Sequence, residues 1–290
     1  MNPTPYILMS FPFMKYLAFF VAVSITSIGY TASFDEIIDK AIAGDHRDPA
    51  FVARDKFRHS KEALKFLGLK PGMTVIEIWP AKGWYTEILA PVMRDQGILY
   101  EATFAMTADR TPDWRKKMHK EFMEKMEKRP DVYDHVVVTE LSVPERTTIA
   151  PPGTADMILT FRNVHNWMKG DYAEEMFKIF HRALKSGGIL GIVEHRAKPG
   201  TSLEQMIKSG YVTVDHVVTL AKQSGFVFEE QSEINANPKD SKDHPAGVWT
   251  LPPSLRYCKK MDEGKDKEQC FLKYKAFGES DWMTLRFSTP

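Results

Sequence analysis

Short apolar runs alternate with amphipathic segments along most of the chain. The apolar runs have the length of β-strands, and the segments between them repeat apolar side chains at the helical period of three to four residues. The runs occupy residues 73–79, 97–104, 135–141, 156–161, 189–194, 226–234 and 282–287. This alternation predicts an α/β fold, a mostly parallel sheet with helices on both faces. Residues 156–161 and 189–194 are almost continuously apolar, which fits strands that are buried on both sides.

The segments between the runs predict helices with recognisable ends. Ser60 is expected to cap one helix and Asp171 another, because a cap side chain accepts a hydrogen bond from a free backbone N–H. Gly68 is expected to end the first of these helices. Arg58 and His59, just before it, are expected to face solvent rather than a pocket. The predicted helices cover residues 34–43, 49–57, 60–67, 84–93, 112–129, 172–185 and 212–224.

The longest predicted helix, residues 112–129, has a strongly basic face. Its apolar residues Trp114, Met118, Phe122 and Met126 recur every four positions. A basic amphipathic helix can bind a membrane surface or an acidic partner. However, a parallel sheet needs a crossover helix between its second and third strands. The sequence therefore favours a helix that packs its apolar stripe on the sheet and exposes its basic face.

The first 34 residues differ in composition from the rest of the chain. Lys15 is their only charged side chain, and the apolar stretch 16–30 is followed by small residues at 31–33. This order is typical of a secretory signal peptide, although the uncharged stretch also approaches the length of a membrane span. We interpret residues 1–32 as a signal peptide, with an uncleaved N-terminal anchor as the alternative. The protein is therefore expected to be exported, to the periplasm.

Composition places the chain among ordinary globular proteins. Its 290 residues are 43% hydrophobic and 27% charged, with 39 Lys and Arg against 38 Asp and Glu, which is unlike disordered, fibrous or polytopic membrane chains. A formal net charge of +1 gives no sign of a nucleic-acid partner, which normally requires a basic domain. Residues 33–290 are expected to form one domain with a polar insertion at about 235–280. Membrane contact is expected only through the N-terminal segment.

The chain has two cysteines, Cys258 and Cys270, twelve positions apart. A structural zinc normally uses four ligands, and no further Cys or His lies close to these two in the sequence, so no metal site is expected. In an exported protein the two cysteines are expected to form a disulfide. Two unpaired thiols are the alternative if the protein is not exported.

The turn after the first predicted strand, residues 77–85, has the sequence EIWPAKGWY. In a doubly wound sheet this turn faces the cofactor, and its glycines let backbone N–H groups approach the ligand. Glu77 and Gly83 resemble the first motif of class I S-adenosylmethionine-dependent methyltransferases, an acidic residue followed by alternating glycines. The string VIEIWPAKGWYTEILAP is similar to a group of exported predicted methyltransferases, and the resemblance extends to TFRNVHNW, LKSGGILGIVEHRA and SGYVTVDHVV.

The resemblance implies a Rossmann-like fold with a seven-stranded sheet and S-adenosyl-L-methionine as the cofactor. In the family's pattern, Glu77 would orient the cofactor's amino group or the turn itself, and Glu101 in the second strand would bind the ribose hydroxyls. A carboxylate paired with a neighbouring Lys or Arg is the alternative role for Glu101. The other residues expected to contact the cofactor are Trp79, Pro80, Ala81, Lys82, Gly83 and Trp84.

The turn departs from the family pattern where Trp79 and Ala81 replace glycine. Gly83 is therefore the position at which the backbone is expected to approach the cofactor. Lys82 is expected to pair with the cofactor's carboxylate or to point to solvent. The departures leave a non-catalytic methyltransferase-fold binding protein of the cell envelope as the alternative function. A nicotinamide-dependent oxidoreductase is disfavoured because the chain lacks the G-x-G-x-x-G motif.

Residues 162–167, RNVHNW, follow the fourth strand and are expected to form a loop between cofactor and acceptor. His165 is the candidate general base, because imidazole titrates near neutral pH and can accept a proton from a hydroxyl, thiol or amine. Asn166 is expected to hydrogen bond to the acceptor, and Trp167 to stack on it. His195, at the end of the fifth strand, is the alternative base. Together these features predict methyl transfer from S-adenosylmethionine to a small-molecule acceptor.

Overall fold

The computed structural model describes residues 32–106 and 111–290. Contacts within the chain divide it into two units, Met1–Ala32 and Ser33–Pro290, and the second unit contains every element described below. The predicted signal peptide lies almost entirely outside the described residues and stays a prediction. In the described part of the chain, no helix has both the length and the apolar composition of a membrane span.

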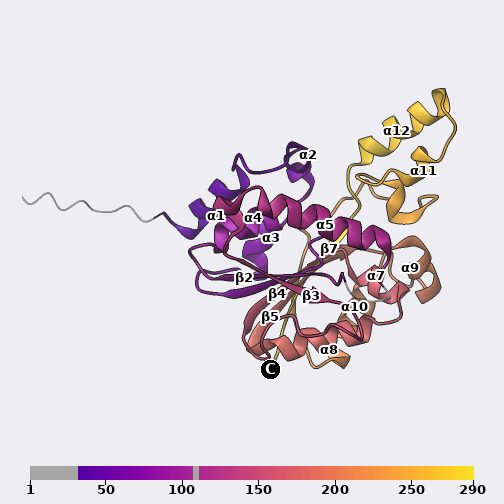
Figure 1. The fold of residues 1–290 in the computed structure, drawn as a ribbon. Helices are drawn as coiled ribbons and strands as arrows, with labels where there is room; N and C mark the ends of the chain where they lie inside the picture. The colour runs from indigo at the N-terminus through magenta and orange to yellow at the C-terminus, as the bar shows by residue number, and fades with distance from the viewer. Residues whose placement is uncertain (1–31, 107–110) are drawn as a thin grey trace, which may run out of the picture. The chain divides into compact units, whose positions relative to one another are not determined.

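A seven-stranded sheet forms the centre of the Ser33–Pro290 unit (Figure 1). Its strands are β1 (Thr74–Ile78), β2 (Ile98–Phe104), β3 (Val136–Leu141), β4 (Ala155–Phe161), β5 (Leu184–His195), β6 (Val227–Ser232) and β7 (Trp282–Ser288). They lie in the order β3-β2-β1-β4-β5-β7-β6. The neighbouring strands β3, β2, β1, β4 and β5 are parallel to one another, whereas β7 is antiparallel to both β5 and β6. The predicted α/β fold with seven strands is thus confirmed, with a mixed sheet.

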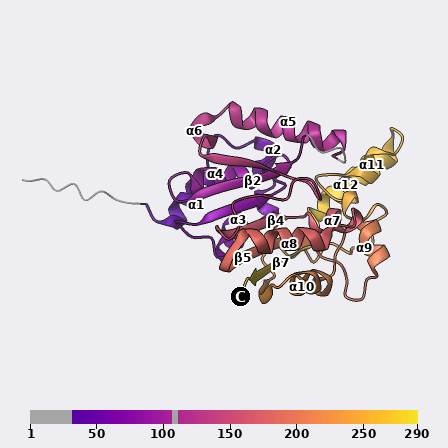
Figure 2. The same cartoon turned by 60° about the horizontal axis from the view of Figure 1, so that its bottom comes forward.

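Helices cover both faces of the sheet (Figure 2). The helices are α1 (Phe34–Ile42), α2 (Pro49–Val52), α3 (Ser60–Leu67), α4 (Thr86–Met93), α5 (Asp113–Glu127), α6 (Pro130–Tyr133), α7 (Val164–Lys169), α8 (Ala173–Ala183), α9 (Leu203–Ser209), α10 (Val214–Gln223), α11 (Arg256–Lys259) and α12 (Lys265–Phe277), with 3-10 turns η1 (Asp55–Phe57) and η2 (Gly247–Thr250). Successive strand residues point to opposite faces. Val75 accordingly belongs to the core with Ile88 of α4 and Phe122 of α5. Ile76 belongs to the opposite core, with Phe180 of α8.

Two predicted helix caps are wrong by one residue. His59 adopts the left-handed conformation (φ 39°) and precedes α3, so Ser60 is the first helical residue. Asp171 is also left-handed (φ 58°), and Tyr172 takes the cap position of α8. In both places the chain turns sharply before the helix, and this turn, rather than a side-chain cap, sets where the helix begins. Gly68 ends α3 as predicted, with φ 93°.

The polar insertion contains more structure than its charged sequence suggests. It includes η2, α11 and α12, which enclose a small apolar cluster around Leu251 and Tyr274. Cys258 and Cys270 belong to this cluster and form the predicted disulfide, with an S–S distance of 2.02 Å. Helix α12 escapes sequence analysis because its few buried positions, among them Cys270, are scattered among exposed charged residues. The disulfide therefore joins two helices across a segment with little core of its own.

Candidate functional site

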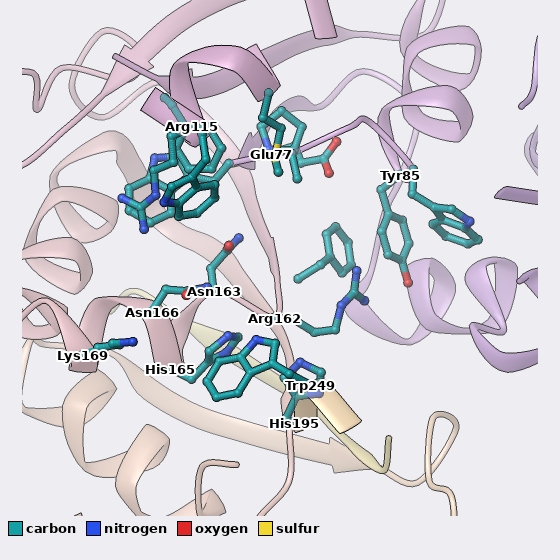
Figure 3. Close-up of a pocket in the computed structure, with 18 of the residues that line it drawn as sticks. Glu77, Tyr85, Arg115, Arg162, Asn163, His165, Asn166, Lys169, His195 and Trp249 are labelled. Atoms are coloured by element: carbon teal, nitrogen blue, oxygen red, sulfur yellow. The ribbon is translucent and has the colours of Figure 1, made fainter. Parts of the chain in front are cut away.

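The carboxyl ends of β1, β4 and β5 surround a cavity of about 510 Å³. Strand order reverses between β1 and β4, and open α/β sheets bind ligands at such a switch point. The side chains in Figure 3 enter the cavity from several elements that are far apart in the sequence. The predicted site residues that line it are Glu77, Trp79, Pro80, Ala81, Trp84, His165, Asn166 and His195.

A second cavity, of about 300 Å³, lies beside the first. Its walls include Arg54, Arg58 and Glu279. The two cavities share Pro80, Ala81, Trp84, Arg162, His195 and Trp249. They are therefore neighbouring parts of one binding region.

The turn after β1 has the backbone conformation of a glycine-rich loop, although most of its residues are not glycine. Trp79, Ala81 and Gly83 have φ of 48°, 57° and 81°, and these are the alternating positions at which the methyltransferase motif has glycine. The left-handed conformation costs a residue with a side chain about 1 to 2 kcal/mol. Non-glycine residues that hold such a conformation concentrate at binding and catalytic sites.

Packing around Trp79 compensates for its strained backbone. The Trp79 side chain is almost fully buried, and its Nε1 donates a hydrogen bond to the Leu141 carbonyl at 3.1 Å. The Arg115 guanidinium lies 4.4 Å from the centre of the Trp79 ring, and the Phe104 ring centroid lies 5.0 Å away. Trp79, Phe104 and Arg115 all line the cavity. Trp79 thus forms, together with Phe104, an aromatic wall of the cavity in which the two rings are tilted by 46° to each other.

Lys82 lines the smaller cavity but not the larger one, and Gly83 lines neither. The Lys82 side chain is 60% exposed and pairs with Glu121 of α5 at 3.0 Å, which agrees with the alternative that Lys82 points to solvent. A Cβ on Gly83 would lie 3.0 Å from the Phe122 ring of α5. The backbone N–H of Gly83 donates to the Pro80 carbonyl at 2.9 Å, so neither this N–H nor the space beside the glycine is open to the cofactor as predicted.

Gly72 is a matched control for the effect of a side chain at Gly83. It has the same φ of 81° but no atom within 4 Å of the point where a Cβ would lie. We expect Gly83→Val to lower the free energy of unfolding by about 1 to 3 kcal/mol more than Gly72→Val, since only the former overpacks a neighbour. Chemical denaturation of both variants measures this difference. Equal losses would show that backbone conformation alone requires Gly83.

Glu77 and Glu101 form a buried pair of carboxyl groups on adjacent strands. Thr86 Oγ1 donates a hydrogen bond to Glu77 at 2.9 Å. Burial raises the pKa of Glu77 to about 7, and burial together with the charge of Glu77 raises the pKa of Glu101 well above its usual value. Glu101 is fully buried inside β2 and does not line the cavity. The structure thus contradicts its predicted contact with ribose hydroxyls.

His165 lies on α7, so the segment expected to be a loop is helical from Val164 onward. His165 Nδ1 lies 3.0 Å from Glu194 Oε1, and its backbone N–H donates to Glu194 Oε2 at 3.3 Å. The backbone N–H of His195 also donates to Glu194 Oε1, at 2.7 Å. A carboxylate that accepts the Nδ1 proton leaves Nε2 as the basic nitrogen. Glu194 was not among the predicted site residues, although the string EHR at the end of β5 contains it.

Two further predicted residues have different surroundings. His195 Nδ1 lies 2.5 Å from Ser280 Oγ, and its ring centroid lies 5.2 Å from that of His165. Burial and the charges of His165 and two nearby arginines lower the pKa of His195 well below its usual value. Trp167 is fully buried in the core and does not line the cavity, so its predicted stacking on the acceptor is wrong. Trp249 of η2, missed in the sequence, lines the cavity instead (Figure 3).

His165, Glu194 and His195 are the one group in the described part of the chain whose ligand atoms could surround a metal ion, all lying within 4.8 Å of one another. Two histidines and a carboxylate match some divalent metal sites. Here, however, both oxygens of Glu194 accept N–H groups of the protein. We therefore interpret Glu194 as the residue that orients His165.

The structure contradicts the expectation that Arg58 faces solvent. The Arg58 side chain is 1% exposed and pairs with Glu279 at 3.2 Å. Glu279 comes from the segment before β7, more than 200 residues away in the sequence. No local pattern around Arg58 could have indicated this partner.

No family model and no curated protein matches the chain. Solved structures do match. A phosphoethanolamine N-methyltransferase 2 from Haemonchus contortus, in complex with S-adenosyl-L-methionine, is 15% identical with a TM-score of 0.52, over 90% of this chain and 61% of that one. A proposed sarcosine dimethylglycine methyltransferase from Galdieria sulphuraria is 16% identical with a TM-score of 0.51, over 81% and 83% of the two chains.

The 4+2 cyclase SpnF is similar to the same degree. It is 13% identical, with a TM-score of 0.52 over 89% of this chain and 93% of that one. At these identities the similarity shows the fold alone, and one fold can support different reactions. The chain therefore has the Rossmann-like methyltransferase fold.

Proposed function

We propose that the protein transfers a methyl group from S-adenosylmethionine to a small-molecule acceptor. The observation that carries this proposal is that a single cavity joins the left-handed turn after β1 to His165 of α7, which Glu194 near the end of β5 holds in place. The turn after β1 suits the binding of a cofactor. His165, oriented by Glu194, suits the role of proton acceptor.

The cavity has chemical groups that fit each part of this cofactor. The aromatic wall of Trp79 and Phe104, capped by Arg115, suits a flat purine, because aromatic rings stack. Glu77 lines the cavity, and its carboxylate suits the amino group of the methionyl end. An ammonium ion beside Glu77 would favour the ionised carboxylate and so offset the burial that raises its pKa. When bound, the cofactor supplies a methyl group on a positively charged sulfur.

The chain's own residues prepare the acceptor. His165 Nε2 takes the proton from the acceptor's hydroxyl, thiol or amine, which makes that atom nucleophilic. Glu194 holds the ring through Nδ1 at 3.0 Å and stabilises the positive charge that the ring acquires. Asn163 fixes the start of this segment, because its Nδ2 donates to the Ile78 carbonyl at the end of β1, at 2.9 Å.

Calorimetric titration with S-adenosylmethionine and S-adenosylhomocysteine tests the proposal most directly. We expect both to bind, with Trp79→Ala weakening both because the aromatic wall is lost. Tyr257→Ala, at a 39% exposed tyrosine that lines neither cavity, is the control for loss of an aromatic side chain. If the folded protein binds neither S-adenosylmethionine nor S-adenosylhomocysteine, the proposal is refuted. That result would support a non-catalytic binding protein with this fold.

A further inference from the structure

Two arginines pair with one buried carboxylate in the smaller cavity, and a third arginine lies close enough for its charge to act on that carboxylate. Arg58 Nε and Nη2 each lie 3.2 Å from Glu279 Oε2, and Arg54 Nε donates to Glu279 Oε1 at 2.5 Å. The guanidinium of Arg162, from the segment after β4, lies 4.7 Å from the centre of the Trp282 ring. Arg58 lies against the same ring at 5.4 Å. We call these four residues, Arg54, Arg58, Arg162 and Glu279, the arginine cluster.

The arginine cluster has more positive than negative charge. Glu279 is the carboxylate that the structure pairs with Arg54 and Arg58. Burial and the nearby charge of Arg162 lower the pKa of Arg58 to about 9. Burial also lowers the pKa of Arg162. Unbalanced buried charge is unfavourable, so the cluster would be stabilised by a further negative charge.

The cluster also has free hydrogen-bond donors. Arg58 Nη1, Arg162 Nη1 and Tyr85 Oη are buried and have no hydrogen-bond partner. Burial raises the pKa of Tyr85 to about 12, so its hydroxyl keeps its proton at neutral pH. Figure 3 shows the Tyr85 hydroxyl beside the Arg162 side chain. Buried polar groups are normally paired, and each exception calls for an explanation.

We propose that the arginine cluster binds an anionic group of the methyl acceptor, a carboxylate or a phosphate. Arg162 and Tyr85 line the larger cavity, and Arg58 and Arg162 line the smaller one, so the anion binds at their junction. Oxygen atoms there accept hydrogen bonds from the three free donors, and their charge balances the cluster. The assignment to the acceptor rests on the proposed function, whereas the anion site itself does not.

The acceptor is a better source of this charge than the cofactor. S-adenosylmethionine has a carboxylate but also an ammonium and a sulfonium, so its binding adds net positive charge beside the arginine cluster, which already has an excess. An anionic acceptor offsets the positive charge of the cofactor and the positive charge of the cluster. Arg162 and His165 follow the same strand and line the same cavity, so one small molecule can place its anion at Arg162 and its nucleophile at His165. The acceptor class is thus a small carboxylic acid or phosphate ester with a hydroxyl, thiol or amine.

Sulfate is a suitable probe of the site, because it is a small oxyanion with no nucleophile. Thermal unfolding of the full chain is followed as sodium sulfate replaces sodium chloride at constant ionic strength. We expect saturable stabilisation of the wild type, and an affinity about ten- to hundred-fold weaker in Arg162→Gln, which loses a charge-assisted hydrogen bond. Arg58→Gln is the second variant and should show the same loss. Lys56→Gln removes an exposed positive charge nearby and should behave like the wild type.

Sulfate stabilises most proteins by exclusion from their surface, and all four proteins share that effect. Equal responses in the wild type and both arginine variants would therefore overturn the proposal. A titration with S-adenosylhomocysteine in sulfate identifies the source of the anion. Unchanged affinity supports an acceptor site, whereas competition would assign the cluster to the cofactor's carboxylate and overturn our assignment. If S-adenosylhomocysteine does not bind at all, the proposed function fails, while the sulfate response still measures the anion site.

Discussion

His165→Ala is expected to lower the rate of methyl transfer by about 10² to 10⁴-fold, the range for loss of a general base, with almost unchanged cofactor affinity. The reason is geometric: His165 follows β4, whereas the cofactor turn follows β1, and both line one cavity. Glu194→Gln should lower the rate less, because the amide oxygen still accepts the Nδ1 proton but supplies no charge. Transfer of a labelled methyl group to acceptors in a metabolite extract provides the assay.

The control for this prediction is His135→Ala, which removes an exposed histidine outside the cavity and should leave the rate unchanged. Calorimetry of His165→Ala with S-adenosylhomocysteine separates the two possible roles of the residue. A loss of cofactor affinity comparable to the loss of rate would show that His165 holds the cofactor. The base would then be His195, which is neutral because its pKa is lowered but is a weaker base for the same reason.

Glu77→Gln is expected to make the fold more stable at pH 8 and to weaken cofactor binding. The pKa of Glu77 is about 7 in the folded protein against an ordinary value of 4.5, so the native state binds this proton more tightly than the unfolded state. Its contribution is fully present below pH 4.5 and is lost as the pH rises to 7, by about 3 kcal/mol in total. Glutamine stays neutral and avoids this loss. Denaturation of both proteins at pH 5 and pH 8 measures it.

The matched variant Glu101→Gln makes the same chemical change on the neighbouring strand. It should also stabilise the fold at pH 8, because it removes the second carboxyl from the buried pair. Cofactor affinity should differ between the two variants: about ten- to hundred-fold weaker in Glu77→Gln, which loses a charge-assisted hydrogen bond, and close to wild type in Glu101→Gln. Equal weakening in both would show that the pair acts through the fold rather than through contact with the cofactor.

Much of the fold could be predicted from local pattern. The seven apolar runs correspond to β1 to β7. The crossover helix α5 buries Phe122 and Met126 as its four-residue spacing predicts, whereas Trp114, the first residue of the predicted stripe, is 55% exposed. The segments that face the cavity were also correct, because the end of a parallel strand can be located in the sequence. Local pattern failed in α12, whose buried residues have no helical period, and at the caps of α3 and α8, where a turn sets the helix start.

The residues of the candidate site could likewise be predicted only in part. Glu77, His165, Asn166 and His195 line the cavity as predicted, since each lies at or just after the end of a central strand. Glu194 was missed because a carboxylate inside an apolar strand has no motif of its own. Glu101 and Trp167 were misplaced for the opposite reason, as both belong to the expected segments but point into the protein interior.

The sequence by itself determined the seven strands, most of the helices between them, and which turns meet at the carboxyl edge of the sheet, because these depend on residue period and chain order. The tertiary structure alone decided where each side chain points. It filled the space beside Gly83 with Phe122 and turned Lys82 outward to Glu121. It also buried Arg58 against Glu279. These contacts join residues that are distant in the chain, and burial and charge act through space, so no local pattern can specify them.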